Sequence, residues 1–237
     1  GKLTIATDEP AYEPWFKDDK PANGEGFESA VAYAVAKQLG YDKSAVVWQS
    51  VPFNKAFAPG VKTFDFDINQ VSISDERKKA VDFSSGYYDV RQAVIALKGT
   101  KAAEAKSVAD LKDLKLGAQV GTTSLDFISE TIAPDSDPFV YNDNSAAKAA
   151  LDAKQVDAIV LDLPTALYVS AVEIESTAVI GQIPSVGGGQ RSGIARLLPD
   201  GSLDSGFSIT EPGSEVSFLR QAPYGKVYAA GRQLRRY

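Results

Sequence analysis

The sequence predicts an α/β protein built from two lobes, and three observations lead to this prediction. Short apolar strands alternate with amphipathic helices over residues 1–184, a pattern typical of parallel sheets covered by helices. The same pattern starts again near residue 115. The length of 237 residues suits two units of about 100 residues each.

The first part of the chain supplies the elements of one sheet. A strand is expected at residues 2–7 (KLTIAT), and an amphipathic helix is expected at 29–39 (SAVAYAVAKQL), where Gly40 ends it. Two further strands are expected at residues 46–49 and 65–71.

The second part repeats this order. A strand is expected at residues 115–119 (KLGAQ), followed by a tight loop and a helix that begins at 125–130. Another helix is expected at 146–153 (AAKAALDA), and a buried strand at 156–161 (VDAIVL). Ligands of such sheets bind beyond the carboxyl ends of the strands.

Two apolar segments are expected to connect the lobes. Residues 93–100 run from an apolar strand into a polar stretch, and residues 178–184 form a second candidate connection. If both segments cross, the first lobe is discontinuous, comprising 1–92 and 187–237, and residues 93–186 form an inserted second lobe. Two connecting strands would make a hinged cleft.

The composition excludes several classes of function. The net charge of −6 and the pI of about 4.8 argue against nucleic acid or an anionic membrane as the main partner, and favour a small ligand. The chain has neither cysteine nor histidine, which excludes disulfides, thiol catalysis, the usual zinc sites and the Ser-His-Asp triad. We expect no metal and no cofactor.

Location is left open by the composition. No apolar run approaches the roughly 20 residues that a membrane-spanning helix needs. The sequence starts directly in an expected strand, without a charged and apolar leader before it. The protein is therefore expected to be either cytosolic or a secreted form whose signal has been removed.

The segment SISDERKKAVDF, residues 72–83, begins with turn and cap residues and becomes basic in the first turn of an expected helix. Cations are unfavourable there, because the backbone N–H groups already form the positive end of the helix dipole. Either Arg77, Lys78 and Lys79 lie on a solvated face, or Arg77 binds a carboxylate through two parallel N–H···O bonds. An anion would satisfy both Arg77 and the helix terminus. This stretch alone does not separate the two interpretations.

Two stretches of the second part offer complementary polar groups. The loop Gly121–Ser124 follows a strand and precedes a helix, so its N–H groups and hydroxyls could bind an anion, although on local grounds capping of the helix is the favoured interpretation. Asp162 ends an apolar strand and could accept from an ammonium group, or it could begin the turn into Leu163 and Pro164.

An aromatic cluster near the N-terminus could form the wall of a pocket. Tyr12, Trp15 and Phe16 follow the acidic residues Asp8 and Glu9, in a stretch whose prolines favour a loop. Such aromatics are often core residues, but Tyr12 could line a pocket. Taken together, an anion clamp, a cation acceptor, an aromatic wall and two lobes fit a zwitterion with closely spaced charges, which means an α-amino acid.

Several motifs together resemble a known family. In order, the chain contains TDEPAYEPW, EGFESAVAYAVAKQLG, FDINQVSISDERKKAVDFSSGYY, GAQVGTTSLDF and DAIVLDLPTALY. Their order and spacing over about residues 2–184 resemble the polar amino-acid-binding proteins of bacterial ABC importers, solute-binding protein family 3. The resemblance implies a two-lobed periplasmic-binding-protein type II fold, hinged by two crossing strands, that closes on its ligand.

The resemblance also implies how the ligand is bound. By motif position, Arg77 would hold the α-carboxylate, assisted by the N–H and hydroxyl of Ser72 and by Thr122 and Thr123 of the second lobe. Asp162 would accept from the α-ammonium group.

Other matched positions would complete the site. The Gln70 carbonyl would share the α-ammonium group, Tyr12 and Phe53 would sandwich the ligand side chain, and Asp8 would lie near its far end. Gln119 occupies a position where relatives often carry a polar or cationic group.

Two departures leave the side-chain specificity open. Gln119 is one of them, and the other is Leu161, which stands where some relatives have histidine. The carboxylates of Asp8 and Glu9 suggest a polar or cationic ligand side chain.

The match weakens after Pro184. Residues 193–203 can serve as a returning strand and turn, but Gly and Pro in 205–213 interrupt any closing helix. The stretch 193–207 (GIARLLPDGSLDSGF) also resembles a β-propeller repeat. Because a single blade cannot bury its hydrophobic face, we favour an atypical or altered C-terminal segment, although a shifted reading frame would give the same pattern.

The resemblance implies a binding protein without catalytic residues. It would be a monomer outside the cytoplasm, in the periplasm or on the outer face of the cell membrane, reaching the membrane through a lipid anchor or through its partner, an ABC importer permease. The alternatives are an enzyme of the cyclohexadienyl or arogenate dehydratase kind on the same fold, with Glu9 and Asp8 as candidate acids, and a sensor domain.

Overall fold

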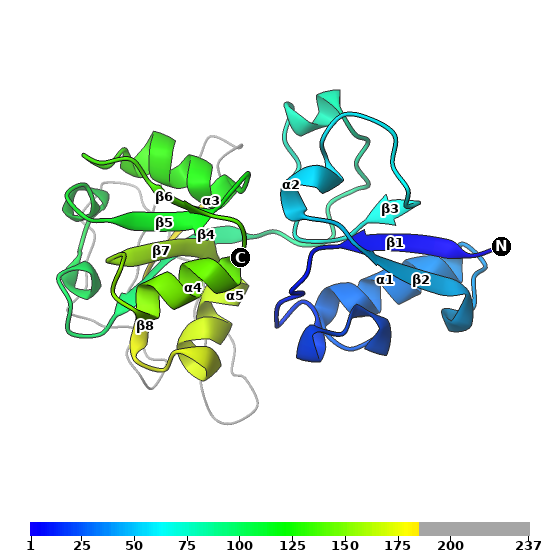
Figure 1. Cartoon of the computed structure of the whole chain (residues 1–237), viewed down its shortest axis with the longest axis horizontal. Helices are drawn as coiled ribbons and strands as arrows, with labels where there is room; N and C mark the ends of the chain where they lie inside the picture. The colour runs from blue at the N-terminus through cyan, green and yellow to red at the C-terminus, as the bar shows by residue number, and fades with distance from the viewer. Residues whose placement is uncertain (185–237) are drawn as a thin grey trace, which may run out of the picture. The chain divides into compact units, whose positions relative to one another are not determined.

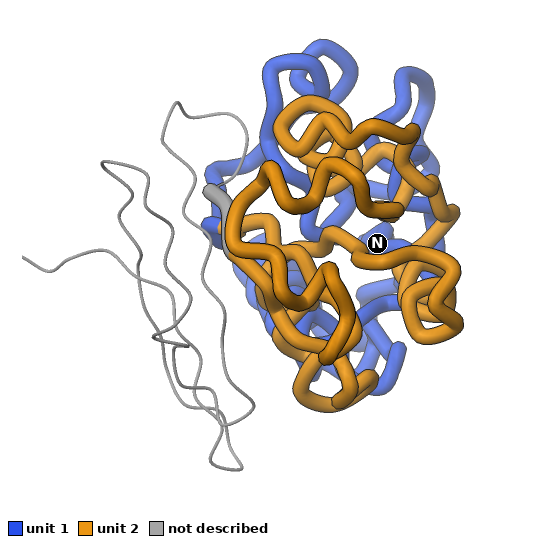
Figure 2. The backbone as a smooth tube through the Cα atoms, turned by 90° about the vertical axis from the view of Figure 1, so that its left-hand side faces the viewer, with its two compact units in different colours: residues 1–89 blue, residues 90–237 orange. Residues whose placement is uncertain are grey.

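The computed structural model describes residues 1–184 and divides the chain into two compact units (Figures 1 and 2). Unit 1 comprises Gly1–Asp89, and unit 2 begins at Val90. The expected C-terminal part of the first lobe, 187–237, and the expected atypical segment lie outside the described residues.

Unit 1 is built on a three-stranded parallel sheet of order β2-β1-β3. Its strands are β1 (Leu3–Thr7), β2 (Val46–Ser50) and β3 (Phe66–Asp67). Its helices are α1 (Phe27–Gln38) and the short α2 (Phe53–Ala56), and four 3₁₀ turns complete it: η1 (Lys17–Asp19), η2 (Pro21–Asn23), η3 (Lys43–Ala45) and η4 (Arg77–Lys79).

The two faces of this sheet carry separate apolar clusters, because successive side chains of a strand point to opposite faces. Ile5 of β1 packs with Ala32 and Ala36 of α1. Ala6, the next residue of β1, packs instead with a cluster that includes Ala56 of α2. The side chains are small where α1 approaches the sheet, which brings the first turn of α1 close to the strand ends.

Two expected elements of unit 1 are shorter than the sequence indicates. The strand expected at 65–71 is reduced to β3. Asp65 N donates to Thr4 O at 2.8 Å, but Thr4 N donates to the Asp65 side chain, at 2.7 Å from Oδ2. At the other end, Gln70 has a φ of 50°. The helix expected in 72–83 is wrong: the segment forms only the turn η4. Three adjacent cations at a helix N-terminus disfavour its extension.

Unit 2 is built on a five-stranded mixed sheet of order β6-β5-β7-β4-β8. The strands are β4 (Arg91–Leu97), β5 (Leu116–Gln119), β6 (Phe139–Tyr141), β7 (Ala158–Asp162) and β8 (Thr177–Pro184). β5, β6 and β7 run parallel to one another, whereas β4 is antiparallel to both β7 and β8. The carboxyl ends of β5 and β7 therefore meet the start of β4.

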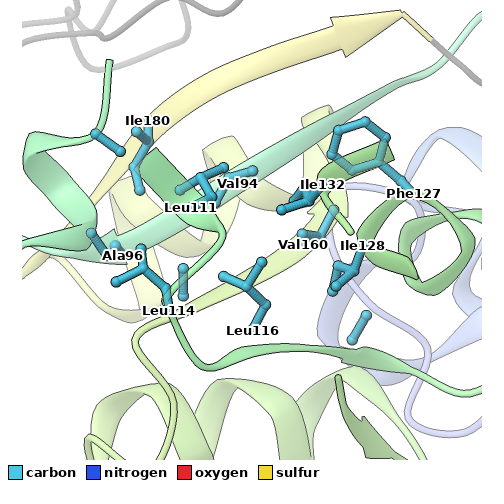
Figure 3. Close-up of a cluster of buried hydrophobic side chains, with 14 of the residues drawn as sticks. Val94, Ala96, Leu111, Leu114, Leu116, Phe127, Ile128, Ile132, Val160 and Ile180 are labelled. Carbon is cyan, nitrogen blue, oxygen red and sulfur yellow. The ribbon is translucent and has the colours of Figure 1, made fainter. Parts of the chain in front are cut away.

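Helices and turns cover both faces of this sheet. They are η5 (Ala102–Glu104), η6 (Val108–Leu111), α3 (Thr123–Asp126), the π-helical η7 (Phe127–Ile132), α4 (Asn144–Asp152), α5 (Leu163–Tyr168) and the π-helical η8 (Val169–Glu173). One face packs against η6 and η7 in the cluster of Figure 3, where Val94 and Val160 meet Leu111 and Phe127. The other face packs against α4 and α5, with Ile95 and Ile159 at its centre.

No helix in the described part of the chain, residues 1–184, is both long enough and apolar enough to cross a membrane.

Candidate functional site

Arg77 is separated from its two basic neighbours by its surroundings. Its side chain is half-buried, with Nη1 donating to Ser72 O at 2.7 Å and the guanidinium carbon 4.4 Å from the ring centroid of Phe57. Lys78 and Lys79 are exposed, and Lys78 forms an ion pair with Asp75 at 3.0 Å. The solvated-face interpretation therefore describes Lys78 and Lys79, whereas Arg77 is held against aromatic rings.

Aromatic rings support the Arg77 guanidinium from α2. Phe53 begins α2, is buried, and lies 5.4 Å from Phe57 in an edge-to-face arrangement. The Arg77 guanidinium carbon is 5.7 Å from the Phe53 ring. Such stacking orients a planar guanidinium, and a planar guanidinium is the group whose fork geometry matches a carboxylate.

Gln70 follows β3 and is bound by a buried carboxylate. Glu28, in the first turn of α1, is 0% exposed. Its Oε1 accepts from Gln70 N at 2.7 Å and from the Tyr87 hydroxyl, and its Oε2 accepts from Gln70 Nε2. Although 42% of Tyr87 is exposed, burial of its hydroxyl end and the nearby Glu28 raise the pKa of Tyr87, so it remains a donor.

Polar side chains gather where β1 and β3 end. Thr7 and Asp67 are the last residues of these parallel strands, and Asp8 and Asn69 follow them closely. Thr7 Oγ1, Asp67 Oδ1 and Asn69 Nδ2 are buried without a hydrogen-bond partner. Burial, reinforced by the charges of Glu28 and Asp8, raises the pKa of Asp67 to about 8. This edge of the unit 1 sheet is therefore rich in carboxyl groups.

The N-terminal loop carries the remaining predicted residues of unit 1. The Asp8 side chain accepts from Glu9 N at 2.8 Å, and Glu9 itself is exposed. Tyr12 is half-buried, and its carbonyl accepts from Trp15 N and from the next amide along the chain. Trp15 and Phe16 are buried, as the core interpretation of the aromatic cluster predicts.

In unit 2, three predicted residues lie between the end of β5 and the start of α3. Gln119, the last residue of β5, is buried. Thr122 caps α3, because its Oγ1 accepts from Leu125 N at 3.2 Å while its hydroxyl donates to Gln119 O at 2.7 Å. The capping interpretation is therefore confirmed for Thr122. Thr123 belongs to a different network.

That network joins Asp162 to Thr123 through Gln92. Gln92, 1% exposed, lies directly opposite Asp162 in the β4–β7 pair. Its Nε2 donates to Asp162 Oδ1 at 2.8 Å and to Thr123 Oγ1 at 3.2 Å, and its Oε1 accepts from the Ser124 hydroxyl. Asp162 is also the N-cap residue of α5, as the turn interpretation expects, but its side chain makes no capping hydrogen bond there.

The structure thus collects the predicted residues into two sets. Unit 1 brings Arg77, Ser72 and Phe53 together and places Gln70 beside them in the chain, and unit 2 brings Thr123 and Asp162 together. Sequence reasoning missed most of the residues that hold these side chains, namely Glu28, Phe57, Tyr87 and Gln92. A glutamine at the start of the apolar run RQAVIAL was the available signal for Gln92.

Within residues 1–184, no group of three or more Asp, Glu, His or Cys side chains is arranged to hold a metal ion.

Comparison with known proteins assigns the chain to a family. A family model of bacterial extracellular solute-binding proteins, family 3, matches residues 3–162. The chain belongs to this family. The match includes the predicted site residues of both units, from Asp8 to Asp162.

Two relatives of known name are about a third identical to this chain over the residues that can be aligned. The L-cystine-binding protein TcyJ of Escherichia coli (strain K12) is 31% identical over 189 residues, which cover 79% of this chain and 68% of that protein. The ABC transporter glutamine-binding protein GlnH of Bacillus subtilis (strain 168) is 33% identical over 147 residues, which cover 60% and 52%.

Solved structures of family 3 type agree with the fold. An ancestral arginine-binding protein bound to arginine is 32% identical, with a TM-score of 0.65, covering 82% of this chain and 83% of that one. An ancestral amino acid-binding protein, described as a precursor of cyclohexadienyl dehydratase, is 30% identical, with a TM-score of 0.63 and coverages of 78% and 79%. The predicted type II fold is confirmed for the part of the chain compared.

A second family model matches the end of the sequence. A β-propeller domain of unknown function matches residues 178–207. This match includes the stretch 193–207, whose likeness to a propeller repeat the sequence shows. Residues 178–184 of the match belong to β8, and the rest lies outside the described residues.

Proposed function

We propose that this family 3 member binds one free α-amino acid with both sets of residues and changes no bond in it. Arg77, with Ser72, receives the α-carboxylate, and Thr122 and Thr123 assist from unit 2. Asp162, with the Gln70 carbonyl, accepts from the α-ammonium group. The observation that carries the proposal is the stacking of Arg77 on Phe57, 4.4 Å from the ring centroid, while its basic neighbours remain exposed.

The ligand side chain is proposed to be polar or cationic. Support comes from the carboxyl groups that gather near the ends of β1 and β3, among them Asp8 and Asp67, with Glu9 nearby. Tyr12 and Phe53 would flank the aliphatic part of the ligand, and Gln119 would contact it from unit 2. The named relatives bind cystine, glutamine and arginine, which is consistent with this class without selecting one amino acid.

The partner is proposed to be the permease of an ABC importer. The relative from Bacillus subtilis is named as an ABC transporter protein, and the family is described as extracellular. In this proposal the protein acts as a monomer outside the cytoplasm, and ligand binding favours the conformation that the permease recognises.

Calorimetry with the twenty standard amino acids and cystine tests this proposal. At least one polar or cationic amino acid is expected to bind with a dissociation constant below about 100 µM, a binding free energy of roughly −5.5 kcal/mol. If none of them reaches that affinity, the amino-acid importer proposal fails.

A dehydratase activity is the second candidate, and the solved structure described as a precursor of cyclohexadienyl dehydratase favours it. Such an enzyme needs a carboxylic acid that protonates the leaving hydroxyl group, and Glu9 and Asp8 are the candidates. Turnover of prephenate or arogenate that disappears in Glu9→Gln would support this activity, whereas the absence of turnover in the unmodified protein would exclude it for these substrates.

A further inference from the structure

Glu28 is a buried carboxylate that holds two distant parts of unit 1. It is 0% exposed and accepts from Gln70 N at 2.7 Å, from Gln70 Nε2 and from the Tyr87 hydroxyl. A carboxylate is costly to bury unless hydrogen bonds replace its hydration. These three donors are therefore strongly bound to Glu28, and Glu28 in turn restricts where they can lie.

Gln70 and Tyr87 are the two ends of the segment that carries Ser72 and Arg77. The structure describes this segment, residues 70–87, in full. Its only regular element is the single turn η4, and most of its residues are exposed. Burial of apolar side chains consequently holds this segment weakly. Glu28 joins both of its ends to the first turn of α1.

Glu28 binds Gln70 through two hydrogen bonds, one from the backbone N–H of Gln70 and one from the side-chain amide of Gln70. Gln70 has a φ of 50°, a left-handed conformation that is unfavourable for a residue with a Cβ. The hydrogen bond to Gln70 N opposes relaxation toward an ordinary strand conformation. The bond to Gln70 N holds the peptide plane between Asn69 and Gln70, and the bond to Nε2 holds the Gln70 side chain. Together they restrain the φ of Gln70, so the position of the carbonyl group that follows is coupled to Glu28.

The N-terminal loop fixes Glu28 itself. Glu28 N donates to Trp15 O at 3.0 Å, and Gly26, which precedes α1, lets the two backbones approach closely. A Cβ at Gly26 would lie 2.4 Å from Trp15 O. Glu28 is thus anchored on one side to a buried loop and on the other side to the segment 70–87.

We propose that Glu28 is a positioning residue for ligand binding, which sets the Gln70 carbonyl and the segment carrying Arg77 without contacting the ligand. This inference rests on the proposed function, in which Gln70 accepts from the α-ammonium group and Arg77 binds the α-carboxylate. It gives the sequence motif EGFE a role in binding that its place at a helix start does not suggest.

The variant that tests the proposal is Glu28→Gln. It keeps the size of the side chain but replaces one carboxylate oxygen, a hydrogen-bond acceptor, by an NH2 group, which is a donor and cannot accept from Gln70 or Tyr87. Glu76→Gln is the matched control, since it makes the same change of charge at an exposed position of the segment. With the amino acid that calorimetry identifies, Glu28→Gln is expected to bind at least tenfold more weakly, and Glu76→Gln within twofold of the unmodified protein.

Two further measurements separate positioning from a general loss of stability. The first is the affinity ratio between the amino acid and its analogue lacking the α-ammonium group, which is expected to fall at least threefold in Glu28→Gln. The second is hydrogen–deuterium exchange, which is expected to increase over residues 70–87 but not in β5 or β7. An unchanged affinity and ratio in a folded Glu28→Gln protein would overturn the proposal.

Tyr87→Phe keeps the proposal testable if Glu28→Gln does not fold. It removes one of the three donors to Glu28 and is expected to weaken binding twofold to fivefold and to increase exchange near residue 87; no change in either overturns the proposal. If the unmodified protein binds no amino acid, the proposed function fails, whereas the exchange of residues 70–87 in the variants still decides whether Glu28 holds the segment.

Discussion

Unit 1 and unit 2 hold their proposed ligand-binding side chains by different means. In unit 2, Thr123 and Asp162 lie at the edge of the sheet, and Gln92 joins them from the directly opposite position of β4. In unit 1, Ser72 and Arg77 lie on a segment with one short turn, held by a buried carboxylate and by aromatic rings.

The comparison shows two ways in which a protein can fix the geometry of a binding site. In unit 2, strand register places Asp162 opposite Gln92, and Gln92 in turn binds Thr123 at the start of α3, so this geometry follows largely from the fold itself. Buried polar contacts place those of unit 1, so their geometry depends on a few specific groups. We therefore expect unit 1 to respond more strongly to pH and to substitution of residues remote from the ligand.

The largest expected effect concerns Asp67 and pH. A carboxyl group whose pKa is about 8 in the folded protein and 3.8 ordinarily binds its proton more tightly when folded. Its stabilising contribution is complete below about pH 4 and is lost as the pH rises toward 8, on the order of a few kcal/mol. In Asp67→Asn, this loss of stability with rising pH is expected to be absent, because asparagine does not titrate.

Protection factors from hydrogen–deuterium exchange at pH 5 and pH 8.5 measure this effect in each unit. Unit 1 of the unmodified protein is expected to lose protection at the higher pH, and unit 2, whose network is built on the neutral amide of Gln92, is expected to change less. Asp82→Asn, at an exposed position, is the control. An equal loss in Asp67→Asn would assign the effect to other groups.

Gly26→Ala is expected to destabilise unit 1 by about 2 kcal/mol or more. The new Cβ would lie 2.4 Å from Trp15 O and 2.7 Å from Phe16 Cα, in a backbone with a φ of 91°. Gly40→Ala has a similar positive φ of 86° but no atom within 4 Å of the Cβ, so it measures the conformational cost alone. Thermal unfolding of both variants gives the comparison, and equal losses would exclude the contact with Trp15 as the cause.

Arg77→Lys is expected to weaken amino-acid binding at least tenfold, about 1.4 kcal/mol. The charge remains, but the planar fork and its stacking on Phe57 are lost. Titration calorimetry measures the change, with Lys79→Ala as a control that removes a whole exposed charge and is expected to stay within twofold. If Arg77→Lys binds the amino acid as tightly as the unmodified protein, Arg77 does not bind the ligand carboxylate.

The smallest effect is expected for Gln92→Leu, which removes the amide between Asp162 and Thr123. Loss of the hydrogen bonds from this uncharged amide corresponds to about 1 kcal/mol, or a threefold to tenfold weaker affinity, because strand register still places Asp162. The exposed Gln155→Leu serves as the control. A loss larger than that of Arg77→Lys would show that the amide, and not the register, positions the unit 2 side chains.

Most strands and the longer helices of both units could be predicted from the sequence, because each carries its own apolar periodicity. The short elements α2, β6 and α5 were missed, because three to six residues are too few to show a period. The failures have local physical causes. β3 ends early where Gln70 adopts a left-handed conformation, and the basic run at Arg77 forms a turn where a helix was expected. A hydrophobicity pattern cannot reveal a positive φ at a glutamine, nor can it reveal that Thr4 N donates to the side chain of Asp65.

The ligand-facing residues of the proposed site could be predicted more readily than those that support them. Arg77 and Asp162 belong to recognisable motifs. Glu28 and Gln92 act on residues 42 and 70 positions away, respectively, so their roles depend on the folded chain. Local sequence describes each of them only as a helix start or a strand start.

The pairing of β4 with β8 has a consequence for protein engineering. Arg91, near the start of unit 2, lies opposite Pro184, the last residue of β8, in an antiparallel register. The backbone therefore comes back to within about one strand spacing, roughly 5 Å, of where unit 2 begins. Residues 90–184 can accordingly be treated as a portable module, one that a surface loop of another protein could accept with its own ends almost undisturbed.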